Sequence, residues 1–153
     1  DVPFLCGSAP IARVGGMGER LEPIPGTFRL SGLVLIPCWR SETAQAYREI
    51  DRKAAGCWTP EEKAIDESER VLSLLASGQK AGLLPNDFLD VLLERHSEYY
   101  EIFGLAEKAG ALAWGLSGSG SAAFALFPPD ADCAGCGEML AHAAGVERIF
   151  FWE

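Results

Sequence analysis

Residues 115–127 read GLSGSGSAAFALF, in which two apolar runs flank a Ser-Gly-Ser-Gly-Ser turn. Glycine allows positive φ angles and lets another molecule approach the main chain closely. Residues 111–117 and 121–127 are therefore predicted to form two strands joined by this turn, which favours an antiparallel sheet. A turn whose backbone lies against a phosphate group would have the same pattern, and the local sequence alone leaves both interpretations open.

Hydrophobic periodicity predicts the remaining elements. Residues 33–36 (LVLI) form a continuous apolar run, typical of an internal strand that is buried on both faces. Residues 148–152 predict a final strand. Helices are expected from Ser41 or Thr43 to Ile50, over 60–77, 87–96, 98–109 and 136–144. The helix over 60–77 has a predicted capping box, with Thr59 as N-cap, Pro60 at the first helical position and Glu62 at the third.

The order of these elements is strand, helices, strand, strand, helix, strand. This order predicts an α+β fold with a ferredoxin-like split βαβ topology, in which an antiparallel sheet carries helices on one face. A short β meander is expected before it, from strands at Asp1–Cys6 and Pro10–Val14 and a GGMGER turn leading into residues 21–24.

The net charge argues against nucleic acid as a partner, and the length of the apolar runs argues against a membrane-spanning helix. The 153 residues carry a formal net charge of −9, so the field of the protein repels nucleic-acid backbones. No apolar run approaches the roughly 20 residues that a membrane-spanning helix needs, and we expect a cytoplasmic protein. The chain starts at Asp1 without methionine and continues directly into apolar residues, which indicates a piece of a longer polypeptide.

Five cysteines include one Cys-x-x-Cys pair, Cys133 and Cys136. A zinc site normally needs a second pair or two nearby histidines, and the two histidines, His96 and His142, do not repeat that spacing. A redox role is formally possible, but the pair does not follow a strand of thioredoxin type. We expect free thiols and no metal, and we expect both histidines to be packed or surface residues.

Six segments in order resemble the C-terminal half of the 4-diphosphocytidyl-2-C-methyl-D-erythritol kinases, a family of the GHMP kinase superfamily. The segments are DVPF (1–4), MGERLEPIP (17–25), P-x5-T-A-x-A-Y (37–47), NDF (86–88), LERH (93–96) and LSGSGSAAFALF (116–127). The resemblance covers nearly the whole chain. It implies transfer of the γ-phosphoryl group of ATP, with Mg²⁺, to a hydroxyl of a small cytidyl diphosphate substrate in isoprenoid precursor synthesis.

The resemblance also implies roles for individual residues. Asp1 matches the catalytic aspartate, which would accept or orient the proton of the alcohol. Thr43 and Tyr47 match positions that meet the cytidyl group, with the ring of Tyr47 against the cytosine. The alternative for Tyr47 is that its ring packs on the core face of its helix beside Ile50. The turn Gly118, Ser119, Gly120 and Ser121 matches a glycine-rich motif at the edge of the active cleft.

The resemblance implies two parts with different partners. Residues 1–28 would join an N-terminal ATP-binding domain, and residues 29–153 would form the substrate-side domain packed against it. The family's main phosphate loop and its active-site lysine do not occur here, so we expect the chain alone to be inactive.

Arg40 and Glu42 are charged where relatives tend to carry small or apolar residues. Two alternatives remain: another GHMP kinase, acting on homoserine, mevalonate or a sugar, and a non-catalytic binding module that uses the aromatic residues 150–152.

Overall fold

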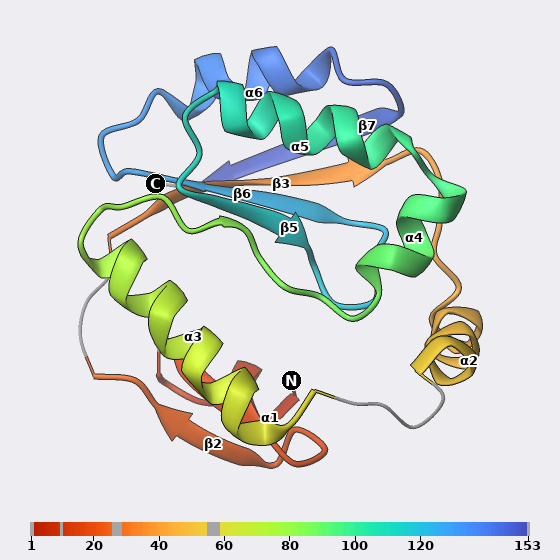
Figure 1. Cartoon of the computed structure of the whole chain (residues 1–153). Helices are drawn as coiled ribbons and strands as arrows, with labels where there is room; N and C mark the ends of the chain where they lie inside the picture. The colour runs from red at the N-terminus through yellow and green to blue at the C-terminus, as the bar shows by residue number, and fades with distance from the viewer. Residues whose placement is uncertain (1, 10, 26–28, 55–58, 153) are drawn as a thin grey trace.

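A five-stranded sheet organises the larger part of the chain in the computed structural model, which describes residues 2–9, 11–25, 29–54 and 59–152 (Figure 1). The strands follow the order β4-β5-β6-β3-β7 across the sheet. Their bounds are Ser31–Pro37 for β3, Gly82–Leu83 for β4, Ala113–Leu116 for β5, Ala123–Phe127 for β6 and Val146–Trp152 for β7. The strand predicted at 33–36 is therefore internal, between β6 and β7.

The predicted split βαβ topology is confirmed for four of these strands. β3 pairs antiparallel with both β6 and β7, and β5 pairs antiparallel with β6. The sheet as a whole is mixed, because the short β4 adds to β5 in parallel. This strand was not predicted, since two residues are too few to show a period.

Within the described ranges, five helices accompany the sheet: α2 (Thr43–Ala54), α3 (Glu61–Ala76), α4 (Leu89–Arg95), α5 (Glu98–Lys108) and α6 (Cys133–Ala141). α5 and α6 lie side by side on the same face of the sheet, as predicted (Figure 1). α3 lies on the opposite side of the sheet, beside the N-terminal segments (Figure 1).

The core lies between the sheet and the helices α4, α5 and α6. Tyr99, Ile102 and Phe127 are almost completely buried in it, together with Leu33 of β3 and Leu140 of α6. In β6 the buried positions alternate with half-buried ones, whereas β3 is buried at five of its seven positions. Each such apolar side chain stabilises the fold by roughly 1.5–3 kcal/mol relative to an exposed one.

The N-terminal segment differs from the predicted meander. Val2–Leu5 form a short helix, α1, where a strand was predicted, and Cys6 N–H donates to the Val2 carbonyl at 3.0 Å. A strand needs a neighbouring chain for its backbone hydrogen bonds, and none pairs with this segment among the described residues. β1 (Ala12–Gly15) and β2 (Arg20–Pro23) form a two-stranded antiparallel hairpin across the predicted 15–20 turn.

Two predicted helix starts are also wrong. Pro60 has an extended ψ of 142°, so α3 begins one residue later than predicted, and no described side chain caps its start. The predicted Thr59 capping box is therefore not formed. α6 begins at Cys133 and not at Cys136, because Asp132 caps it by accepting a hydrogen bond from Gly135 N–H at 3.0 Å.

The outer edge of the sheet carries exposed aromatic side chains. On β7, the side chains of Phe150 and Phe151 are 55% and 60% exposed. No helix among the described residues is long and apolar enough to span a bilayer.

Candidate functional site

The Ser-Gly segment forms the hairpin turn between β5 and β6, as the local pattern predicted. Gly120 N–H donates to the Ser117 carbonyl at 3.1 Å, and Ser117 N–H donates to the Ala122 carbonyl at 2.9 Å. Gly118 and Gly120 have φ angles of 56° and 79°, in the left-handed region that favours glycine. The alternation of serine with glycine therefore suits the backbone of this turn.

Side chains from three separate segments of the chain hold the carbonyl groups of the turn. The Asn86 side-chain amide donates to the Gly118 carbonyl at 3.0 Å and to the Leu116 carbonyl at 3.3 Å. The Ser41 hydroxyl donates to the Ser119 carbonyl at 2.9 Å, and the Tyr99 hydroxyl donates to the Ser121 carbonyl at 2.7 Å. We call Ser41, Asn86 and Tyr99 the carbonyl clamp.

The carbonyl contacts orient the N–H groups of the turn. In a trans peptide, the carbonyl of one residue and the N–H of the next point in opposite directions. The Gly118 carbonyl accepts from Asn86, so the Ser119 N–H points away from Asn86. The Ser117 carbonyl accepts from Gly120 N–H, so the Gly118 N–H points away from Gly120. Neither N–H has an acceptor among the residues that the structure describes. Gly118 is exposed and Ser119 is half-buried, so this backbone can receive an anion.

Thr43 and the turn, predicted to share a site, are in direct contact. Thr43 is the first residue of α2, and its Oγ1 lies 3.1 Å from Ser119 Oγ, within hydrogen-bonding distance. Both hydroxyls are accessible. The two segments are 76 residues apart in the chain, and the fold brings them together at one end of the sheet.

Tyr47 lies one helical turn after Thr43, and its side chain is 55% exposed. Its ring meets the Phe88 ring edge to face, with 5.0 Å between the ring centres. The core face of α2 is formed by Ala46 and Ile50, which are buried. Tyr47 therefore does not pack beside Ile50, and much of its ring surface is free to contact a ligand.

Aromatic side chains pack around Tyr99, the buried member of the carbonyl clamp. Trp39 stacks on His96 with 4.7 Å between ring centres, and its indole N–H donates to the Tyr99 hydroxyl at 3.3 Å. Burial raises the pKa of Tyr99 above the ordinary value, so this hydroxyl keeps its proton and donates to Ser121. His96 is thus a packed residue, as predicted.

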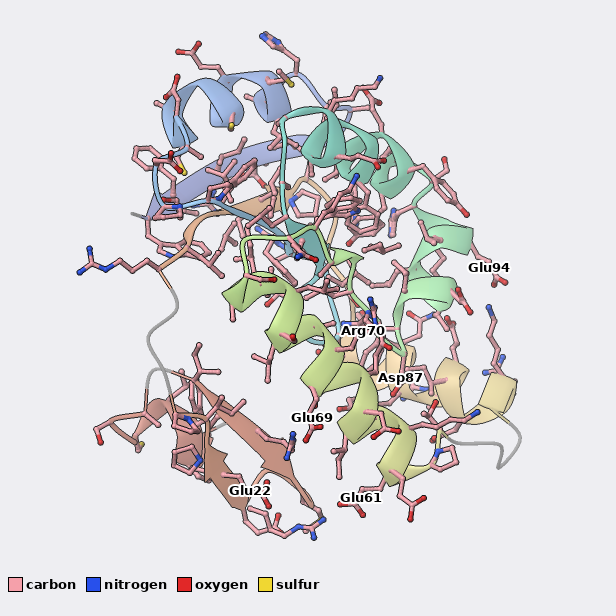
Figure 2. All side chains as sticks on the ribbon, turned by 60° about the vertical axis from the view of Figure 1, so that its left-hand side comes forward. Glu22, Glu61, Glu69, Arg70, Asp87 and Glu94 are labelled. Carbon is pink, nitrogen blue, oxygen red and sulfur yellow. The ribbon has the colours of Figure 1, made fainter. Side chains whose placement is uncertain are left out.

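A cleft of about 600 Å³ lies between the β1–β2 hairpin, α3 and residues 84–87. Arg13, one of its lining residues, joins the hairpin to α3 by pairing with Glu69 at 3.1 Å, and it also pairs with Glu22 on the adjacent strand at 3.2 Å. Figure 2 shows Glu69 on α3 and Glu22 on the hairpin. Asn86 of the clamp also lines this cleft, which places the cleft next to the turn.

Two further predictions concern Asp1 and the Cys-x-x-Cys pair. Asp1, the predicted catalytic residue, lies outside the described residues, so its role stays a prediction. Cys133 and Cys136 are free thiols, and burial raises the pKa of Cys136 above its ordinary value, which disfavours the reactive thiolate.

Sequence reasoning missed the carbonyl clamp. The sequence shows Asn86 only within the NDF segment, just before the predicted 87–96 helix, and its side-chain oxygen accepts from Phe88 N–H at 2.9 Å, ahead of α4. The same side chain also holds the turn through its NH₂ group. Tyr99 is one of the buried residues of α5, and its position in the sequence does not distinguish it from Ile102 or Phe103. Only the tertiary fold shows which carbonyls these donors reach.

This fold and these motifs agree with a known protein family. Residues 61–136 match the family described as GHMP kinases C terminal. The chain therefore carries the C-terminal domain of the GHMP kinases.

Curated relatives extend the similarity over most of the chain. It is 37% identical over 131 residues to a 4-diphosphocytidyl-2-C-methyl-D-erythritol kinase of Solibacter usitatus, covering 83% of this chain and 40% of the relative. A protein of the same name from Symbiobacterium thermophilum is 35% identical, covering 84% of this chain and 44% of the relative. The chain thus spans less than half the length of these relatives, and it matches their C-terminal half.

Solved structures confirm the fold. The crystal structure of a 4-(cytidine 5'-diphospho)-2C-methyl-D-erythritol kinase matches with a TM-score of 0.66 and 26% identity, over 92% of this chain and 48% of that one. A homoserine kinase from Cytophaga hutchinsonii matches with a TM-score of 0.56 at 16% identity, over 88% of this chain and 44% of that one. That second similarity supports the fold alone.

Proposed function

We propose that this chain is the substrate-side domain of a kinase that transfers the γ-phosphoryl group of ATP to a hydroxyl of 4-diphosphocytidyl-2-C-methyl-D-erythritol. The observation that most supports this substrate is the similarity to kinases of that name over 83–92% of the chain. The intact enzyme would act in the cytoplasm, in isoprenoid precursor synthesis.

The described residues can supply the substrate-binding part of this reaction. Tyr47 offers an exposed ring, and a flat ring is a suitable platform for a cytosine base. Thr43 and Ser119 offer accessible hydroxyls beside the turn. The free N–H groups of Gly118 and Ser119 suit a phosphate oxygen. These groups bind and orient, and none of them is a strong base.

The remaining parts of the reaction belong to groups outside the described residues. Asp1 would accept or orient the proton of the alcohol as the new O–P bond forms. ATP and Mg²⁺ would be held mainly by a domain equivalent to the N-terminal half of the relatives, with residues 1–28 joining that domain and residues 29–153 packing against it. We therefore expect the 153-residue chain alone to show no phosphoryl transfer.

Tyr47→Ala is expected to weaken CDP binding to the full-length gene product by about 5- to 150-fold, because stacking of a base on an aromatic ring contributes roughly 1–3 kcal/mol. Isothermal titration with CDP measures this loss. Tyr47→Phe keeps the ring and should bind CDP as the wild type does.

Tyr100→Ala is the matched control for this test. Tyr100 is 65% exposed on α5 and is not one of the residues of the proposed site, so its loss should leave the CDP affinity unchanged. Equal affinities for the wild type and Tyr47→Ala would show that Tyr47 does not contact the cytidyl group. A wild-type protein that does not bind CDP would contradict the proposed substrate itself.

A further inference from the structure

We propose that Asn86 is a positioning residue, which fixes the 117–121 turn so that the Gly118 and Ser119 N–H groups bind a phosphate of the substrates. The inference rests on the proposed function, in which the turn borders the reacting ligands. Asn86 itself does not touch the ligand in this account. Its effect passes through the backbone of the turn.

The contacts of Asn86 join the end of β5 to the turn. Its NH₂ group donates to the Leu116 carbonyl, at the end of β5, and to the Gly118 carbonyl, within the turn. One side chain therefore connects the last strand residue to the first glycine of the turn. Without this support, Gly118 has access to several backbone conformations, and only some of them present the Gly118 and Ser119 N–H groups together.

The anchoring of Asn86 makes this support rigid. The Asn86 side-chain oxygen accepts from Phe88 N–H at 2.9 Å, so both ends of the amide group are engaged and its orientation is fixed. Phe88 in turn contacts the ring of Tyr47. Asn86 thereby connects the two parts of the site, the phosphate-binding backbone and the cytosine platform.

Asn86→Asp and Asn86→Ala are the variants that test the proposal. In Asn86→Asp the carboxylate can still accept from Phe88 N–H, but it cannot donate to the carbonyls of Leu116 and Gly118. Asn86→Ala removes the donor without adding a charge, so the two variants together separate positioning from repulsion. Gln79→Glu is the control, because it makes the same amide-to-carboxylate change at an exposed residue.

The measurement is the affinity of the full-length gene product for cytidine, CDP and a non-hydrolysable ATP analogue. We expect both Asn86 variants to bind CDP or the ATP analogue at least about tenfold more weakly, because hydrogen bonds to a charged group are among the stronger ones. Cytidine, which has no phosphate, should bind within about twofold of wild type. If the variants lose affinity for CDP, the turn binds the diphosphate of the cytidyl substrate. If they lose affinity for the ATP analogue, the turn binds the phosphoryl group that is transferred.

Amide NMR signals of Gly118 and Ser119 give a readout that does not depend on the cytidyl substrate. Inorganic pyrophosphate should shift both signals in the wild type and in Gln79→Glu, and it should shift neither in the Asn86 variants. Equal weakening of cytidine and CDP, or unchanged pyrophosphate shifts in both variants, would overturn the positioning role. If the wild type binds neither cytidine nor CDP, the proposed function fails, while the pyrophosphate shifts still decide the role of Asn86.

Discussion

Asp1→Asn in the full-length gene product is expected to lower kcat by about 10²- to 10⁴-fold, the range that a positioned general acid or base contributes. An alcohol is a weak nucleophile, and asparagine cannot accept its proton as the bond to phosphorus forms. KM should change little, because the amide keeps the size and hydrogen-bonding reach of the carboxyl group. Steady-state kinetics with detection of ADP measures both constants.

Asp90→Asn is the control for the loss of one negative charge. Asp90 is exposed in the first turn of α4 and has no role in the proposed site, so its kcat should equal that of the wild type. A kcat for Asp1→Asn within about threefold of wild type would show that Asp1 is not the base that accepts or orients the proton of the alcohol.

Gly120→Ala is expected to lower the free energy of unfolding by about 2–5 kcal/mol. The φ angle of 79° is unfavourable for alanine by roughly 1–2 kcal/mol, and a Cβ there would lie 2.5 Å from Leu92 Cδ1. Leu92 is only 2% exposed, so it cannot move aside freely, and overpacking adds roughly 1–3 kcal/mol. Urea unfolding followed by tryptophan fluorescence measures the loss.

Gly118→Ala separates the two causes. Gly118 also has a positive φ, of 56°, but a Cβ at this position would have no described atom within 4 Å. Its substitution should cost only the backbone part, about 1–2 kcal/mol. If the two variants lose the same stability, the close approach of Leu92 to Gly120 does not contribute to the cost.

The sheet could be predicted because its strands carry strong local signals. The apolar run at 33–36 and the runs on both sides of the Ser-Gly turn fix three strands, and their order with the helices fixes the topology. β4 and the α1 helix could not be predicted. β4 is two residues long, and the apolar residues at the start of the chain fit a strand or a helix equally well.

The candidate site was predictable in part. The motif resemblance assigned Thr43 and the turn to one site, and the structure shows the two in contact, while their role in binding stays a prediction. The donors behind the turn were not predictable, because Ser41, Asn86 and Tyr99 come from separate segments and their partners are backbone carbonyls. A carbonyl group is present at every residue, so the sequence does not show which ones need a donor.

The most direct test of the account is a phosphoryl-transfer assay with the full-length gene product, ATP, Mg²⁺ and one acceptor at a time. We predict that 4-diphosphocytidyl-2-C-methyl-D-erythritol is phosphorylated, which phosphorus-31 NMR would detect as a new phosphomonoester signal. Homoserine and mevalonate should give no such product. Phosphorylation of homoserine or mevalonate in place of the cytidyl alcohol, or of none of the three, would contradict the proposed function.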